Sequence, residues 1–107
     1  VKEAVAAMRA SKVFELLVNK RNEEDAWGIV GVVDIVKDVI VSGRNADNVF
    51  VYEIMTKPVI TVPADMDIRY AIRLLLRVGV HRAPVENMGE IAGMFRLSSL
   101  VMEHELL

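Results

Sequence analysis

The sequence contains no cysteine among its 107 residues, so it can form no disulfide, thiolate nucleophile or zinc–sulfur site. No apolar run approaches the roughly 18 residues that a membrane-spanning helix needs. Neither sign of charge dominates, with 13 basic and 15 acidic side chains, whereas general binding to nucleic acid usually requires a basic surplus. We therefore expect a cytoplasmic globular protein with no membrane span and no general affinity for nucleic acid.

The chain also has little that could act as a catalyst. It contains no nucleophile–base pair, no phosphate-binding glycine loop and no metal motif. Asp65 and Asp67 could form a carboxylate pair, but both lie at a predicted helix start, where capping explains them. His81 and His104 do not have the spacing of metal ligands. We therefore predict that the protein is not an enzyme and has no metal site or permanent cofactor.

The clearest pattern that is present is an internal repeat. A helix-like piece, a strand-like run and a second strand-like run around a glycine occur twice in the same order. The copies are offset by 67 residues at the first landmark (71 − 4) and by 62 at the second (93 − 31). One loop insertion of 5 residues (67 − 62) within the polar stretch 19–26 would reconcile these offsets. The repeated pieces are Ala4-Val5, Val13–Val18 and Ile29–Val33, then Ala71-Ile72, Val80–Val85 and Ile91–Phe95.

Periodicity and turn residues predict the elements of the first copy. Apolar residues at helical spacing open it, and β-branched runs follow. Asp34 is a candidate helix N-cap, and Gly43 is a candidate for the residue that follows the helix end. The predicted elements are a helix over 1–8, strands over 13–18 and 27–33, a helix over 35–42 and a polar linker over 44–48.

The second copy has stronger signals. Prolines bracket a short β-branched run, and an amphipathic stripe begins after Asp65 and ends at Gly79. The whole pattern predicts an α+β fold with helices packed on small sheets. The predicted elements are a helical turn over 49–55, a strand over 59–62, a helix between Asp65 and Gly79, a hairpin of strands over 81–85 and 90–95, and a helix over 100–106 capped by Ser98 or Ser99.

The second copy resembles a CBS domain, the regulatory module named after cystathionine β-synthase. The resemblance rests on Ile54–Val62, the helix after Asp65, Gly79–Val85 and Gly93 with the strand and helix that follow. The first copy matches more loosely over 1–42 and lacks a leading Met-Thr-Pro segment. We interpret the chain as a tandem CBS pair, residues 1–48 and 49–107. Its β-α-β-β-α units would form small three-stranded sheets around a pseudo-twofold axis, with the first repeat truncated or completed by another chain.

This resemblance implies a non-catalytic sensor that binds AMP, ADP, ATP or S-adenosylmethionine in the cleft between the two repeats. A typical nucleotide-binding repeat has a glycine, then Ser or Thr three residues on for phosphate, then Asp six residues on for ribose. Counted from Gly31 and Gly93, these positions do not hold the expected pair in either repeat. The implied ligand residues are Thr56, Pro58, Val59, Ile60, Arg82, Ala83, Pro84, Arg96 and Ser99, with Asp34 and Lys37 in the first repeat.

The residues at these positions favour the second repeat as the ligand site. Arg96 could form charge-assisted hydrogen bonds with phosphate, and Ser99 could bind an anion at a helix start. Asp34 would repel phosphate but could hold a ribose. Apolar helix surface would be covered by a second copy, so we also expect a homodimer.

The rival reading is a dimerisation or partner-docking module that binds no small ligand. The departures from the Gly-Ser-Asp pattern favour it. Arg69, Arg73 and Arg77 recur on one helix face, and this stripe is either a solvated face or a docking surface for an acidic partner.

Overall fold

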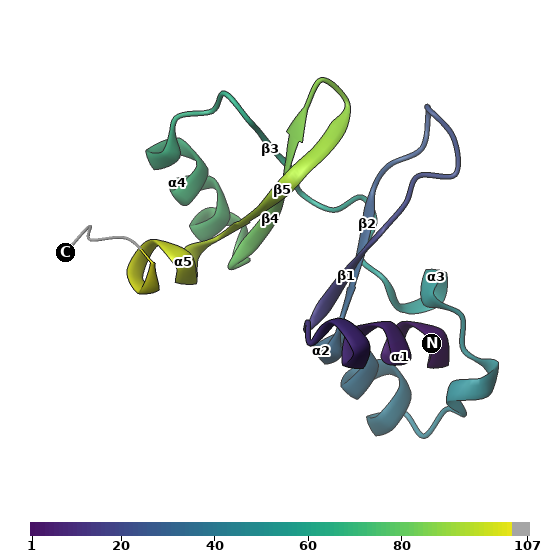
Figure 1. The fold of residues 1–107 in the computed structure, drawn as a ribbon. Helices are drawn as coiled ribbons and strands as arrows, with labels where there is room; N and C mark the ends of the chain where they lie inside the picture. Colours follow the sequence, from purple (N-terminus) through teal and green to yellow (C-terminus); the bar gives the residue numbers. More distant parts are fainter. Residues whose placement is uncertain (104–107) are drawn as a thin grey trace. The chain divides into compact units, whose positions relative to one another are not determined.

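The computed structural model describes residues 1–103, and the chain divides into two compact units (Figure 1). Unit 1 comprises residues 1–59 and unit 2 comprises residues 60–107. Each unit combines helices with a small sheet, as the sequence predicts. The division in space differs from the predicted repeat boundary after residue 48, because the segment 49–59 packs on unit 1. Val49 and Ile54, from this segment, lie in the core of unit 1. The repeat boundary itself stays a prediction.

Unit 1 is built around an antiparallel hairpin. Its two strands pair from Glu15 opposite Gly31 to Val18 opposite Gly28, and all four residues of the second strand are buried. The core below them contains Met8, Val30, Val39, Val49 and Ile54. The elements are α1 (Lys2–Ser11), β1 (Glu15–Val18), β2 (Gly28–Gly31), α2 (Val32–Ile35), the π-helix η1 (Val36–Val41), the 3₁₀-helix η2 (Ala46–Asn48) and α3 (Val51–Ile54).

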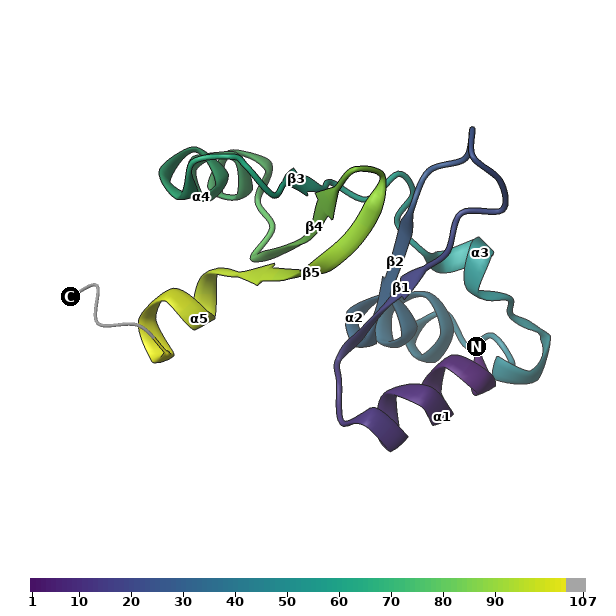
Figure 2. The same ribbon diagram turned by 45° about the horizontal axis from the view of Figure 1, so that its top comes forward.

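Unit 2 has a three-stranded sheet in the order β3-β4-β5. The first pair is parallel and the second is an antiparallel hairpin, which Figure 2 shows beside helix α4. The core contains Val62, Ala71, Leu75 and Ala83, and Leu75 is fully buried. The elements are β3 (Val62–Pro63), α4 (Ile68–Val78), β4 (Arg82–Asn87), β5 (Glu90–Arg96) and α5 (Leu97–Met102).

The N-cap residues of α2 and α4 differ from the predicted ones. Asp34 is not the N-cap of α2: the helix begins at Val32, and Asp34 Oδ2 accepts a hydrogen bond from the Gly31 N–H at 2.7 Å. Asp67, rather than Asp65, caps α4, since its Oδ1 accepts the Arg69 N–H at 2.8 Å. Both predicted glycine positions are confirmed, with φ angles of 74° at Gly43 and 84° at Gly79.

The last helix also begins earlier than predicted. Its N-cap is Arg96, so Ser98 and Ser99 lie inside α5 instead of capping it. The predicted helix over 100–106 extends past the described residues, and His104 also lies outside them.

The predicted strand over 59–62 is divided between the two units. Only Val62 and Pro63 form a strand in unit 2, where they pair with Val85 and Glu86. Val59 instead donates its N–H to Trp27 O in unit 1, whereas the Thr61 hydroxyl donates to Glu86 Oε2 in unit 2.

The hairpin registers correct the alignment of the two copies. Glu15 lies opposite Gly31 in unit 1, and Arg82 lies opposite Arg96 in unit 2. The first strands are therefore offset by 67 residues (82 − 15) and the second strands by 65 (96 − 31). Gly93 thus corresponds to Gly28, and the predicted alignment of Gly93 with Gly31 is wrong. The sequence alone allows both alignments, because Gly28 and Gly31 lie only three residues apart.

Candidate ligand-binding site

The predicted ligand residues fall into two sets, one in each unit. Those of unit 1 come from the start of the α2–η1 helix and from the segment after α3. Those of unit 2 come from the β4–β5 hairpin and the first turn of α5, apart from the half-buried Ile60, which precedes β3. The unit 1 set is Asp34, Lys37, Thr56, Pro58 and Val59, and the unit 2 set is Ile60, Arg82, Ala83, Pro84, Arg96 and Ser99.

In unit 1, Asp34 stands at the point where β2 passes into helix. One carboxylate oxygen is occupied by the Gly31 N–H, and the residue is half-buried. Its other oxygen remains available to accept hydrogen bonds from a ligand. Lys37 lies one turn further along and is exposed. This is the arrangement of a carboxylate that can bind hydroxyl groups at the end of a strand.

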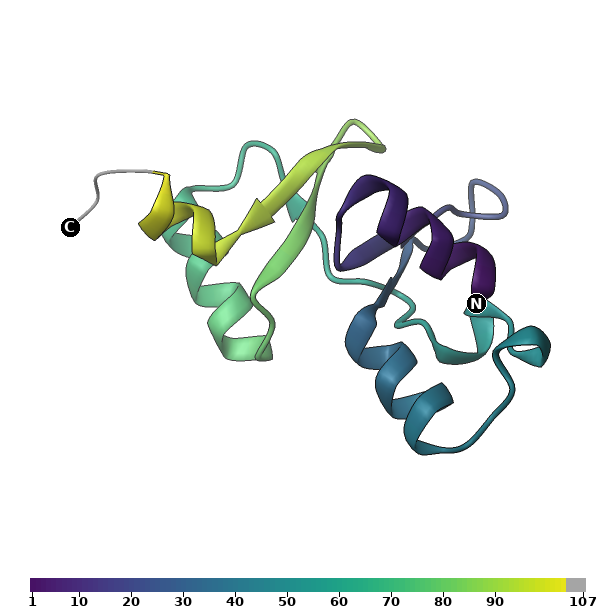
Figure 3. The same ribbon diagram turned by 60° about the horizontal axis from the view of Figure 1, so that its bottom comes forward.

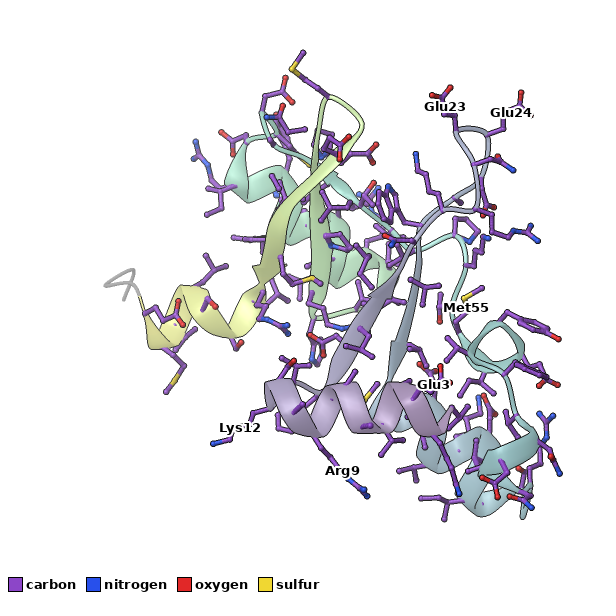
Figure 4. All side chains as sticks on the ribbon, turned by 45° about the vertical axis from the view of Figure 1, so that its right-hand side comes forward. Glu3, Arg9, Lys12, Glu23, Glu24 and Met55 are labelled. Carbon is purple, nitrogen blue, oxygen red and sulfur yellow. The ribbon has the colours of Figure 1, made fainter. Side chains whose placement is uncertain are left out.

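The segment after α3 runs along the outer edge of β2. Thr56 N donates to Ile29 O at 2.8 Å, Ile29 N donates to Thr56 O at 2.9 Å, and Val59 N donates to Trp27 O at 2.8 Å. Figure 4 labels Met55 at the start of this segment. These backbone bonds fix the Thr56–Val59 stretch beside the strand that leads to Asp34.

An ion pair also holds this segment. Lys57 Nζ lies 2.7 Å from Asp25 Oδ2, and both side chains are largely covered. Arg21 also donates to Asp25 from its backbone N–H at 2.9 Å. The Lys57 ammonium, followed by the Arg21 backbone N–H, holds the pKa of Asp25 far below its ordinary value of 3.8. Sequence reasoning missed this pair, because the two residues lie 32 positions apart.

In unit 2, the hairpin brings five predicted residues together. Arg82 lies opposite Arg96 in the β4–β5 register, and Ser99 follows within the first turn of α5. Ala83 and Pro84 are buried, and Ala83 belongs to the core of unit 2. The side chain of Ala83 therefore serves packing, and the polar groups of this set are those of Arg82, Arg96 and Ser99.

The corrected register changes which residues fill the ligand-binding positions. Counted from Gly28, the third residue on is Gly31 and the sixth is Asp34; counted from Gly93, they are Arg96 and Ser99. The first repeat thus carries the Asp at the sixth position but no hydroxyl at the third. The sequence contained this signal, since counting from Gly28 rather than Gly31 finds Asp34 directly.

A separate feature of unit 1 is an apolar groove of about 440 Å³. It is lined by α1, by the chain that leads into β1 and by the α2–η1 helix, which Figure 3 shows running on from β2. Phe14 and Ile40 on its wall are 74% and 66% exposed. Arg9 and Lys12 stand at its margin, and Figure 4 shows their side chains extending away from α1.

The comparisons with known proteins identify the family. The profile of the CBS domain matches residues 51–104, about half of the chain, and the chain therefore belongs to the CBS-domain family. Proteins of this family are regulatory modules, and the predicted α+β fold of tandem CBS repeats is confirmed by the solved structures below.

Three similar proteins show how far this likeness extends. An uncharacterized protein of Methanopyrus kandleri is 33% identical over 87 residues, covering 80% of this chain and 43% of that protein. The structure of a hexameric CBS-CP12 protein from bloom-forming cyanobacteria is 33% identical, with a TM-score of 0.87, covering 97% of this chain and 60% of that one. The chain thus spans roughly half the length of these relatives.

The third is a CBS domain pair solved in complex with 5′-methylthioadenosine and S-adenosyl-L-methionine. It is 20% identical with a TM-score of 0.72, covering 94% of this chain and 77% of that one. At this identity the likeness concerns the fold alone. Among residues 1–103, no helix is long and apolar enough to cross a membrane.

Proposed function

We propose that this chain is a non-catalytic regulatory module that binds an adenosine-containing ligand, namely AMP, ADP, ATP or S-adenosylmethionine. The observation that carries the proposal is Asp34, which stands six residues after Gly28 where a CBS repeat has its ribose-binding carboxylate. Its free carboxylate oxygen could accept hydrogen bonds from both ribose hydroxyls. A CBS domain pair of the same fold in complex with adenosyl compounds supports this class of ligand.

The remaining residues of unit 1 suit the rest of such a ligand. Thr56, Pro58 and Val59 present backbone and apolar surface in a segment that β2 and the Asp25–Lys57 pair hold in place. Gly31 offers no hydroxyl to a phosphate, so the first repeat favours a ligand bound chiefly through its nucleoside. In unit 2, Arg96 at the third position could bind phosphate, while Ser99 replaces the ribose carboxylate. Binding would then shift the chain between conformations that an attached domain or partner detects.

Isothermal titration calorimetry with AMP, ATP and S-adenosylmethionine tests this proposal. Asp34→Asn keeps an oxygen for the Gly31 N–H but removes the charge, and we expect an affinity at least about tenfold weaker, since hydrogen bonds to charged groups contribute about 1.5–3 kcal/mol. Asp38→Asn, one turn further along the same helix, is the matched control and should bind like the unmodified protein.

Two results would contradict the proposal. One is the absence of binding heat with all three compounds from a folded protein. The other is equal binding by the Asp34→Asn variant, which would separate Asp34 from the ligand. Arg96→Ala serves as the corresponding variant of unit 2: if it alone weakens binding, the ligand belongs to the second repeat.

A second candidate function, self-association without a small ligand, is favoured by the apolar groove of unit 1. We propose that a second copy of the chain covers it, as the hexameric relative supports and as its apolar walls would require. Ile40→Glu should lower the mass measured by light scattering, because Ile40 lines the groove. Val41→Glu, at the exposed neighbouring position outside the groove, should not. Equal masses for both variants, or a monomeric unmodified chain, would contradict this assembly.

A further inference from the structure

Helix α4 exposes a stripe of arginines on the side away from its core. Ala71 and Leu75 turn the opposite side of the helix into the core of unit 2. The arginine stripe comprises Arg69, Arg73 and Arg77, all of them exposed, and one helical turn of about 6 Å separates each from the next. No acidic residue occurs within α4. The arginine stripe therefore concentrates positive charge on one face of a chain whose net charge is −2.

The charges of the arginine stripe are little compensated within the described residues. Arg69 Nε lies 3.7 Å from Asp67 Oδ1, in an exposed pair of the kind that contributes little. The Arg73 guanidinium lies 5.8 Å from the centre of the Tyr70 ring. Among residues 1–103, neither Arg73 nor Arg77 forms an ion pair with a carboxylate. Like charges four residues apart destabilise a helix, so carboxylates from a partner would relieve a repulsion that the chain alone retains.

An apolar row runs beside the arginine stripe on the same helix. It comprises Ile68, Ile72 and Leu76, of which Ile68 is 50% and Leu76 63% exposed. Ile72 and Leu76 lie three residues after Arg69 and Arg73, and residues at this spacing are neighbours on a helix surface. Exposed apolar side chains beside a charged stripe are typical of a surface that contacts another protein. A nucleic-acid backbone would pair with the arginines but leave the apolar row in water.

We propose that the exposed face of α4 binds an acidic amphipathic helix of a different polypeptide. The partner's carboxylates, one in each turn, pair with the arginine stripe, and its adjacent aliphatic side chains pack on the apolar row. An extended segment does not match this face, because neighbouring side chains of a strand point to opposite sides. A second copy of α4 does not match it either, because that helix contains no carboxylate. This surface is separate from the proposed nucleoside residues of unit 1, so it is available with or without a small ligand.

A labelled synthetic peptide tests the proposal with the 107-residue chain. The probe is a helical peptide of about 15 residues, with blocked ends and a fluorescein group, that carries glutamate at every fourth position beside a row of leucines. Fluorescence anisotropy should show saturable binding that weakens as the salt concentration rises, and amide NMR shifts should follow α4.

Three results with these probes would overturn the proposal. The first is no binding up to about 1 mM chain, a concentration that would detect even weak association. The second is equal affinity for a matched peptide with glutamine in place of each glutamate, because the arginine stripe would then not recognise charge. The third is tighter binding of a labelled oligothymidylate than of the glutamate peptide, which would make the surface one for nucleic acid.

Substitutions of exposed side chains, which the fold should tolerate, locate the site. Arg73→Gln combined with Arg77→Gln should weaken peptide binding by about fivefold, because two exposed ion pairs are lost. Leu76→Ala should weaken it by at least about threefold through lost apolar contact. Arg9→Gln combined with Lys12→Gln removes the same charge from unit 1 and, as the matched control, should change the affinity by less than about twofold. Undiminished affinity of either α4 variant would overturn the proposal. So would a loss in the unit 1 variant as large as that in the α4 arginine variant, because the peptide would then occupy the apolar groove.

Discussion

Replacing Gly28 with valine should destabilise unit 1, whereas the same change at the corresponding glycine of unit 2 should not. In unit 1 the new Cβ would lie 3.0 Å from Met55 Sδ and 3.4 Å from the Thr56 carbonyl oxygen. The methionine sulfur can move, but the carbonyl belongs to a backbone fixed by two hydrogen bonds to Ile29. Valine adds two methyl groups beyond the Cβ. Either the segment shifts or the side chain leaves its preferred rotamer.

Insertions of this kind into packed structure cost about 1–3 kcal/mol, and we expect about 2 kcal/mol for Gly28→Val. Gly93→Val should remain within about 0.5 kcal/mol of the unmodified protein, since a Cβ added at Gly93 would meet no atom within 4 Å and valine suits a strand. Urea unfolding measures both changes. The fluorescence of Trp27, the only tryptophan, follows unit 1, and far-ultraviolet circular dichroism follows the whole chain.

An unfolding free energy of Gly28→Val within about 0.5 kcal/mol of the unmodified protein would refute this reasoning. It would mean that the Met55–Thr56 segment does not approach Gly28 in solution. A loss at Gly93 as large as that at Gly28 would refute the open space beside Gly93.

Three further predictions concern the packing, capping and charge of single residues. Leu75→Ala should destabilise the protein by about 3 kcal/mol in urea unfolding, because this side chain is fully buried in the core of unit 2; a cost below about 1 kcal/mol would contradict that core. Asp67→Ala should cost about 1 kcal/mol through the lost cap on the Arg69 N–H, whereas Asp67→Asn should keep most of it. The pKa values of Asp25 and Glu53 are lowered in the folded state, below their ordinary values of 3.8 and 4.5. Both carboxylates therefore stabilise the folded protein fully above those ordinary values, and their contribution declines as the pH falls. The urea concentration at the unfolding midpoint should decrease below about pH 5, and Asp25→Asn should make this decrease smaller.

The sequence predicted the element types well because their signals are local. The apolar spacing over 1–8 and the stripe after Asp65 both became helices, and Gly43 and Gly79 follow helix ends as predicted. The errors lie where a distant partner decided the outcome. The stretch over 59–62 reads as one strand, yet Val59 donates its N–H to Trp27 O of unit 1 while Val62 pairs with Val85 of unit 2. No periodicity within the stretch could indicate this division.

The candidate site shows the same limit. Residue types and a family resemblance selected Asp34, Arg96 and Ser99, but assigning their positions required the pairing of Glu15 with Gly31 and of Arg82 with Arg96. With that register, the position that the family resemblance assigns to ribose falls on Asp34, and the proposed nucleoside site therefore lies in the first repeat rather than in the second. The Asp25–Lys57 pair had no sequence signal, because ion pairs between loops distant in sequence follow only from the folded backbone.

The most direct test of the central claim is an amide NMR titration of the unmodified chain with AMP and with S-adenosylmethionine. The account predicts saturable shifts centred on Gly28, Gly31 and Asp34, with smaller effects on the Thr56–Val59 segment. Absence of any saturable shift, from a spectrum that shows a folded protein, would contradict ligand binding by this module. Shifts centred on Arg96 and Ser99 alone would contradict the assignment of the nucleoside to Asp34.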